Sequence, residues 1–248
     1  MNEKFPISVI VITLNEEANI ERCLRSVSWA DEIIIVDSFS EDTTLAIAGR
    51  FTDKIFQRRF TDYGEQKNYA LSKATHSWVL SIDADEVVPE ELAAEIRETI
   101  GTGTAAAGYC IKRQSFIFGT RFRFAGMQDD KPLRLFRKEN GAFVQPIHEF
   151  VEIKGTRGML KNVLHHYSSA TLSAYFRKMD HYTDMEAEFL RKKGYRLKFI
   201  DFFLKPLYMF GYLYFFRMGF RDGYEGFIYC IFASWYVFMK YSKYRELR

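Results

Sequence analysis

The chain has 248 residues and a formal net charge of +3 at pH 7. This length suits one α/β domain with an appendage, and the small charge argues against a nucleic-acid-binding protein. Three widely separated cysteines, Cys23, Cys110 and Cys230, fit neither a disulfide framework nor a zinc knuckle, so we expect a reducing, cytoplasmic compartment.

The first hundred residues alternate between strand-like and helix-like patterns. Residues 7–13 are a continuous β-branched run, typical of a strand buried on both faces of a parallel sheet. Further strands are predicted at 32–37, 54–57 and 78–82, and helices at 15–27, 43–50, 64–74 and 89–100, the last starting with Pro89. This alternation predicts βαβ units and an α/β fold with a mostly parallel sheet. Because the first strand begins at residue 7, we expect no signal peptide.

The pattern changes after a small-residue connector at 102–108. Short strands and loops are expected to about Leu164, then a polar helix at 171–193 and two or three amphipathic, aromatic-rich helices from Phe199 onward. No apolar run reaches the ~18–20 residues that a membrane-spanning helix needs. We therefore expect a main domain at 1–168, with halves at 1–100 and 101–168. A C-terminal helical extension is expected at 169–248.

Two aspartates, Asp83 and Asp85, follow the strand predicted at 78–82. Side chains at i and i+2 of an extended chain point to the same side, so both carboxylates are expected to reach one divalent cation. Mg²⁺ or Mn²⁺ takes oxygen ligands and neutralises charge on a departing diphosphate. Acidic pairs also occur in surface loops, but α/β proteins bind ligands where strands end.

Polar side chains also follow the first two predicted strands. Thr13 ends the first strand and Asn15 and Glu16 come after it, and Asp37 ends the second strand with Ser40 after it. Parallel strands end at one edge of a sheet, so these residues predict a nucleotide crevice. Helix capping by Asn15 and Ser40 is the alternative. The absence of a Gly-rich dinucleotide loop and of a Walker lysine loop argues against a dehydrogenase or a P-loop enzyme.

Four motifs occur in an order and spacing that resemble glycosyltransferase family 2. They read Ile-Val-Ile-Thr-Leu-Asn-Glu-Glu from Ile10, Ile-Val-Asp-Ser-Phe-Ser-Glu-Asp from Ile35, Glu-Gln-Lys-Asn from Glu65 and Ile-Asp-Ala-Asp-Glu from Ile82. The resemblance implies an inverting enzyme with a Rossmann-like GT-A fold. It also implies a nucleoside-diphosphate sugar donor bound by residues 1–100.

The second half is similar to one branch of that family. Its motifs are Pro-Leu-Arg-Leu-Phe-Arg from Pro132, Ile-His-Glu from Ile147 and Leu-His-His-Tyr from Leu164. This branch includes β-glucosyltransferases that extend the inner core of lipopolysaccharide. The resemblance implies that residues 101–168 bind the acceptor.

The resemblance also implies roles for single residues. Nucleoside contacts are expected from Thr13, Asn15, Glu16 and Asp37. Lys67 would lie near the nucleotide, with a solvated helix lysine as the alternative. Asp83 would lie by the ribose and the metal and Asp85 on the metal, with His166, or its neighbour His165, completing the shell. The implied cofactor is Mg²⁺ or Mn²⁺.

An inverting transfer needs a base that takes the proton of the attacking acceptor hydroxyl. We predict that Glu149, in Pro-Ile-His-Glu from Pro146, is this base, because it matches the His-Glu pair of the branch. Asp130 and Asp129 are the alternatives for the base. Both also fit a simple turn before the proline at 132.

Basic residues among apolar ones leave alternatives open. Arg134 and Arg137 lie in a strand-like stretch, where they bind the diphosphate or an anionic acceptor, or line a solvated strand face. Residues 116–127 mix aromatics with Arg121 and Arg123. This segment is either an acceptor loop on which sugars stack or a hydrophobic hairpin packed on the core.

Aromatic and basic residues interleave over 198–248. The pattern fits helices lying at a bilayer interface, with a dimer interface or a helical lid as alternatives. The acidic residues Asp201, Asp222 and Glu225 weaken a simple electrostatic anchor.

The resemblance thus implies transfer of a hexose from a UDP-hexose donor. UDP-glucose is the first candidate for this donor. The acceptor would be a lipid-linked saccharide, such as a lipopolysaccharide core heptose or an exopolysaccharide intermediate, at the inner face of the bacterial cytoplasmic membrane. One alternative is a nucleotidyltransferase acting on sugar phosphates, which the acidic, glycine-free segment 15–17 disfavours. The other is a non-catalytic saccharide-binding protein at the membrane.

Overall fold

The structure is a computed structural model that describes residues 6–145 and 149–247. It divides into two compact units, described separately below. The first unit comprises 1–113 and 131–166, and the second comprises 114–130 and 167–248. Two long strands, β6 (Gly108–Ile117) and β11 (Arg157–Ser169), contribute residues to both units.

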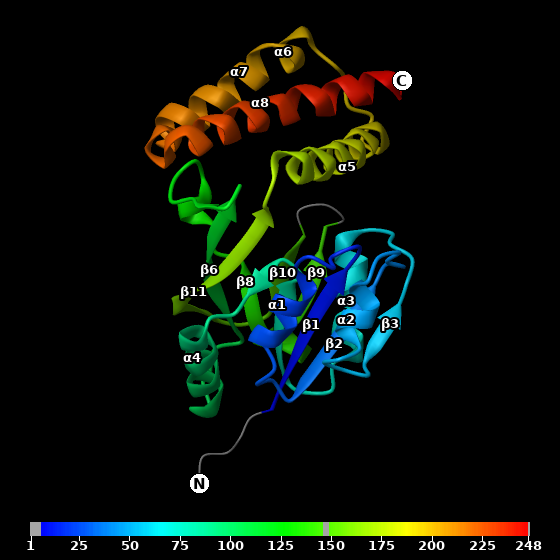
Figure 1. The fold of residues 1–248 in the computed structure, drawn as a ribbon, viewed down its shortest axis with the longest axis vertical. Helices are drawn as coiled ribbons and strands as arrows, with labels where there is room; N and C mark the ends of the chain where they lie inside the picture. The colour runs from blue at the N-terminus through cyan, green and yellow to red at the C-terminus, as the bar shows by residue number, and fades with distance from the viewer. Residues whose placement is uncertain (1–5, 146–148, 248) are drawn as a thin grey trace. The chain divides into compact units, whose positions relative to one another are not determined.

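The first unit is built on a mixed sheet whose order is β3-β2-β1-β4-β8-β6-β11-β5 (Figure 1). Its other strands are β1 (Ile7–Thr13), β2 (Glu32–Asp37), β3 (Ile55–Gln57), β4 (Trp78–Asp83), β5 (Glu86–Val87) and β8 (Leu133–Arg137). Strands β1 to β4 are parallel, whereas β8 runs antiparallel to β4 and β6, and β5 to β11. A separate hairpin comprises β9 (Gly141–Val144) and β10 (Phe150–Ile153). The expected α/β class is confirmed.

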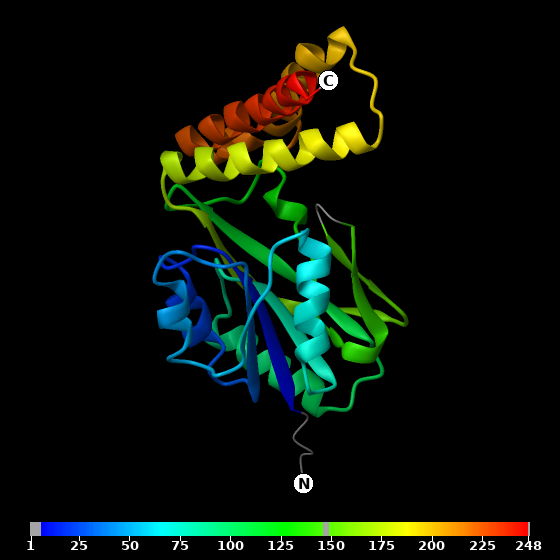
Figure 2. The same cartoon turned by 90° about the vertical axis from the view of Figure 1, so that its right-hand side faces the viewer.

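Helices cover both faces of the parallel strands. They are α1 (Ile20–Ser26), α2 (Thr44–Ala48), α3 (Tyr63–Lys73) and α4 (Glu90–Gly101). A short 3-10 turn, η2 (Lys138–Asn140), follows β8. Val9 and Ile35 belong to the core layer with α1 and α4, and Ile10 and Val36 to the layer with α3. Figure 2 shows α3 lying along the sheet. Burial on both faces explains why these strands read as continuous apolar runs.

Several element boundaries differ from the prediction. The helix expected at 15–27 begins only at Ile20, because Asn15 has a left-handed φ of 53° and the Glu16 amide donates to the Thr44 hydroxyl (2.8 Å). Pro89 is the N-cap of α4 rather than its first residue. The region after residue 108 contains the long strands β6 and β11 instead of short ones, since each continues from one unit into the other.

The second unit is mainly helical. It contains β7 (Thr120–Arg121), η1 (Met127–Asp129), α5 (Leu172–Lys192), α6 (Phe199–Phe202), α7 (Leu204–Gly211), the π-helical turn η3 (Tyr212–Phe216), η4 (Gly219–Asp222) and α8 (Gly223–Glu246). Helix α8 packs on α5 and α7. None of the helices in the described part of the chain has the length and apolar character of a bilayer-spanning segment.

Residues 116–127 pack within the second unit. Phe122 is buried in its core with Leu213 and Cys230. Arg121 and Arg123, on either side of Phe122, are exposed. The hairpin interpretation therefore holds for Phe122, while an acceptor role for the two arginines stays a prediction.

Candidate active site

Asp83, the last residue of β4, lies between two cationic side chains. Its Oδ1 is 2.7 Å from Lys67 Nζ and its Oδ2 is 2.5 Å from an Arg134 guanidinium nitrogen. Burial alone raises the pKa of Asp83, but Arg134 and Lys67 outweigh it and hold that pKa well below its ordinary value. Asp83 is therefore ionised at neutral pH.

Lys67 links Asp83 to the predicted base. It comes from α3, whose N-cap Asp62 accepts the Glu65 amide (2.8 Å). Lys67 Nζ also donates to Glu149 Oε1 at 2.5 Å, and its side chain is only 3% exposed. The interpretation as a solvated helix lysine is therefore wrong.

Arg134 is fixed from its other side by Glu86. The Arg134 guanidinium lies 2.5 Å from Glu86 Oε1, and Arg113 approaches the same oxygen at 3.2 Å. Glu86 Oε2 also accepts the Asp83 amide (2.9 Å). Burial lowers the pKa of Arg134, but the charges of Asp83 and Glu86 raise it above its ordinary value, so the guanidinium stays protonated. Glu86, which sequence reasoning gave no role, thus holds the site arginine.

Arg137 lies away from this cluster. Its guanidinium is 4.7 Å from the centre of the Trp78 ring and donates to the Thr104 carbonyl (3.2 Å). Arg134 is therefore the arginine of this stretch that joins the carboxylates.

Asp85 lies in the turn between β4 and β5, one residue before Glu86, which is the register partner of His166 in β11. His166 Nε2 is 3.4 Å from Asp85 Oδ2. His165 and His166 are consecutive in β11, so their side chains point to opposite faces of the sheet. Of the two histidines, His166 is therefore the one beside Asp85. His166 Nδ1 is buried without a hydrogen-bond partner.

A carboxylate and an imidazole nitrogen this close fit a divalent cation such as Mg²⁺ or Mn²⁺. In the described part of the chain, no three His, Cys, Asp or Glu side chains are grouped to hold a metal ion. Mg²⁺ commonly takes one or two protein ligands and completes its shell with substrate phosphates and water. The pair therefore fits a cation that binds together with a phosphorylated ligand.

Two loops follow β1 and β2 and bind each other through side chains. The Asn15 amide donates to Ser40 Oγ, and Asn15 Oδ1 accepts the Glu41 amide, both at 2.8 Å. Ser40 Oγ donates in turn to the buried Asp37 carboxylate (2.5 Å). The N-caps of α1 and α2 are Asn19 and Thr43, so helix capping by Asn15 and Ser40 is wrong.

A cavity of about 700 Å³ opens between these loops. Its lining is polar and aromatic, from Leu14, Asn15, Ser38, Phe39, Glu41, Arg59 and Phe60. Arg59, Phe60 and Phe39 were missed from the sequence. Arg59 follows the carboxyl end of β3, so the rule applied to the other strand ends points to it as well.

Thr13 and Glu16 lie beside these loops without lining the cavity. Thr13 Oγ1 is buried and has no hydrogen-bond partner, and the Thr13 carbonyl accepts the Ser38 amide (2.9 Å). Glu16 Oε2 accepts from the Asn19 amide group (2.8 Å). Their nucleoside contacts stay predictions.

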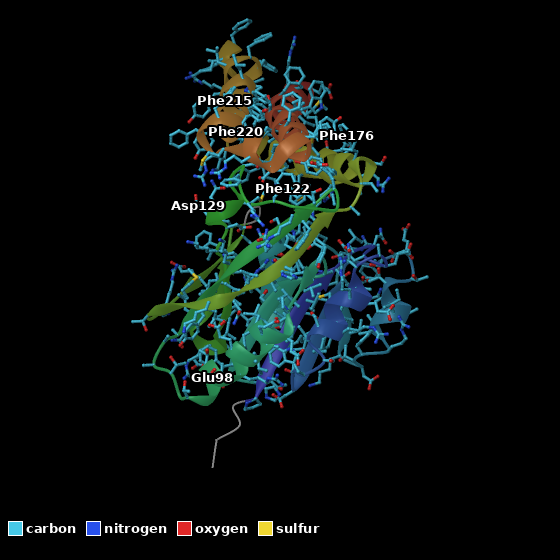
Figure 3. All side chains as sticks on the ribbon, turned by 60° about the vertical axis from the view of Figure 1, so that its left-hand side comes forward. Glu98, Phe122, Asp129, Phe176, Phe215 and Phe220 are labelled. Carbon is cyan, nitrogen blue, oxygen red and sulfur yellow. The ribbon has the colours of Figure 1, made fainter. Side chains whose placement is uncertain are left out.

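The alternative bases belong to the second unit. Asp129, labelled in Figure 3, forms an ion pair with Arg217 of the same unit. Asp130 is also in the second unit. Its role as the base stays a prediction. The first three residues of the Pro-Ile-His-Glu motif, 146–148, lie outside the described residues.

Known proteins are similar to this chain in sequence. The family described as Glycosyl transferase family 2 matches residues 8–168. The lipopolysaccharide core biosynthesis glycosyltransferase LpsC of Rhizobium meliloti is 29% identical over 98% of this chain and 93% of its own length. An uncharacterized glycosyltransferase of Rickettsia typhi is 30% identical over 97% of this chain and 87% of its own length.

Among solved structures, S. aureus TarS 1–349 in complex with UDP-GlcNAc matches with a TM-score of 0.51 and 16% identity. The match covers 97% of this chain and 89% of TarS. This likeness supports the expected GT-A fold. Because the family match covers more than half of the sequence, the chain belongs to glycosyl transferase family 2.

Proposed function

We propose that this family 2 enzyme transfers a hexose, with inversion, from a UDP-sugar to a lipid-linked saccharide at the inner face of the cytoplasmic membrane. The observation that carries the proposal is the arrangement at the end of β4, where Lys67 joins Asp83 to Glu149 and Asp85 meets His166. The relationship to LpsC supports an acceptor in lipopolysaccharide core synthesis. Family membership removes the nucleotidyltransferase alternative.

The reaction we propose is a direct displacement at the anomeric carbon. Glu149 takes the proton of the acceptor hydroxyl as that oxygen attacks, and the nucleoside diphosphate leaves from the opposite face. Lys67 holds the Glu149 carboxylate through Oε1. Asp85 and His166 would hold Mg²⁺ or Mn²⁺, which supplies charge neutralisation on the diphosphate.

The nucleotide would occupy the cavity between the loops after β1 and β2. Asn15 lines this cavity, whereas Asp37 does not line it and accepts a hydrogen bond from Ser40 of the same loop. Arg59 supplies a positive charge on the rim, which suits a ligand with phosphates. Asp83 keeps both oxygens on Lys67 and Arg134, so we assign it to positioning these cations rather than to the metal shell.

A donor panel with purified lipid-linked acceptor tests the proposal. We expect transfer from a UDP-hexose, an inverted product linkage by NMR and loss of activity with EDTA. The panel includes UDP-glucose and UDP-GlcNAc, the ligand in the TarS structure. No transfer with any donor would favour the non-catalytic alternative.

Substitution of Glu149 tests its role as the base. A general base contributes about 10²–10⁴-fold to a rate, so Glu149→Gln is expected to lose at least ~100-fold in kcat. The matched control is Glu98→Gln on α4, an exposed glutamate outside the cluster (Figure 3). If Glu149→Gln keeps the rate of Glu98→Gln, the base is elsewhere and Asp130 becomes the next residue to test.

A further inference from the structure

The segment 204–220 of the second unit exposes large apolar side chains. We call this set the apolar face, and its members are Leu204, Leu207, Tyr208, Phe215, Phe216 and Phe220. Leu204 and Tyr208 are four residues apart on α7, so they share one side of that helix. Phe215 and Phe220 both approach the Tyr214 ring, at 5.1 and 6.2 Å, and Figure 3 shows them on the same side of this unit.

The exposure of these side chains is unusually high for their type. Phe216 is 74% exposed, Tyr208 68% and Leu207 67%. Contiguous exposed apolar surface on a soluble unit marks an interaction site rather than ordinary surface. The apolar face therefore needs an occupant.

The charges around the apolar face identify that occupant. Asp201 is fully buried, where it accepts from the Lys198 amide (2.8 Å) and pairs with Lys205 (2.7 Å). Asp222 accepts the backbone amides of residues 123 and 124, at 3.0 and 2.9 Å. Two of the three acidic residues that weakened an electrostatic anchor in the sequence are thus held by hydrogen bonds within the unit, Asp201 in its interior and Asp222 partly exposed.

Basic side chains near the apolar face remain exposed. Arg196 and Lys198 precede α6, and Arg221 lies in η4 with its guanidinium 4.6 Å from the centre of the Phe124 ring; all three residues are exposed. Exposed aromatics bordered by Lys and Arg are the pattern of helices that lie in a bilayer interface and are attracted to anionic lipids. A second copy of this chain docked symmetrically would bring the same basic residues together, which is unfavourable.

We propose that the apolar face inserts into the surface of an anionic lipid bilayer, with Arg196, Lys198 and Arg221 contacting lipid phosphates. The inference rests on the proposed function in one respect: lipid binding would bring the enzyme to a lipid-linked acceptor. Binding to lipid is measured without donor or acceptor. Failure of this inference is therefore distinguishable from failure of the proposed function.

Co-sedimentation of the full chain with vesicles tests the proposal. We expect binding to vesicles of equal parts phosphatidylcholine and phosphatidylglycerol, and much weaker binding to phosphatidylcholine alone. Phe215→Ser with Phe216→Ser is expected to weaken binding by at least about tenfold, because two exposed rings no longer enter the interface. Phe150→Ser, at an exposed phenylalanine of β10 in the first unit, is the matched control and should bind as wild type.

Charge substitutions test the electrostatic part. Arg196→Gln and Lys198→Gln are each expected to weaken binding to the phosphatidylglycerol vesicles by about fivefold, and added salt should weaken wild-type binding. Absence of vesicle binding by the wild type, or equal binding by the double phenylalanine variant, would overturn the proposal. A dimer in sedimentation equilibrium that the same double variant dissociates would assign the apolar face to a second copy instead.

Discussion

Replacing Lys67 by methionine removes a buried cation that two carboxylates share. Lys67 Nζ lies 2.7 Å from Asp83 and 2.5 Å from Glu149, and its side chain is 3% exposed. Asp83 retains Arg134 in the variant, whereas Glu149 loses the cation that holds its Oε1. Removing one partner of a buried ion pair costs about 3–5 kcal/mol, a large part of the ~5–15 kcal/mol that stabilises a typical protein.

The assay is denaturant unfolding of the variants at neutral and acidic pH. At pH 7, Lys67→Met should lose about 3–5 kcal/mol in the free energy of unfolding, and Lys67→Arg should recover part of it. The control is Lys73→Met on the same helix, whose ammonium lies over the rings of Phe56 and Tyr69 instead of between carboxylates.

The pH dependence of this loss follows from Asp83. Its folded-state pKa lies well below the ordinary value of 3.8, so its ion pairs stabilise the fold above about pH 4, and this contribution is lost as the pH falls through the folded pKa. Without Lys67 the folded pKa moves up towards 3.8, so the stability difference between wild type and Lys67→Met should shrink on acidification. A loss within about 0.5 kcal/mol of Lys73→Met at pH 7, or one independent of pH, would refute the shared-cation account.

Two further substitutions test the scaffold of the site. The Asn68 side chain both donates to and accepts from the Phe143 backbone, at 2.8 and 2.9 Å, so Asn68→Ala should lower the free energy of unfolding by about 1–3 kcal/mol in denaturant titrations. For Glu32, burial raises the pKa, but hydrogen bonds from Lys54, Ser8 and Thr75 lower it from 4.5 to about 2. Its stabilising contribution is present above pH 4.5 and lost towards pH 2, so thermal melts of wild type and Glu32→Gln should converge over that range; parallel pH profiles would contradict this.

The elements that a sequence pattern specifies locally were predicted well. Strands β1 and β2 have the predicted bounds, because burial on both faces leaves an uninterrupted apolar run with polar residues at its end. The polar helix predicted at 171–193 is α5, capped by the Thr171 side chain, which accepts the Ala174 amide. Asp83 was placed at the end of its strand for the same reason.

Pairings between distant residues were not readable from the sequence. The contact between Lys67 and Glu149 joins residues 82 positions apart, and that between Arg134 and Glu86 joins residues 48 apart. Both depend on tertiary packing, including the antiparallel register of β8 against β4, which hydrophobic periodicity does not encode. The packing of Phe122 with the C-terminal helices is non-local in the same way.

The most direct test of the central claim is calorimetric titration of UDP into the protein with and without Mn²⁺. The claim is that Asp85, beside His166, holds the cation that binds the diphosphate. We expect Mn²⁺ to strengthen UDP binding to the wild type, and Asp85→Ala to lose that strengthening while its unfolding transition stays cooperative. Equal Mn²⁺-dependent binding of UDP by Asp85→Ala and wild type would contradict the account.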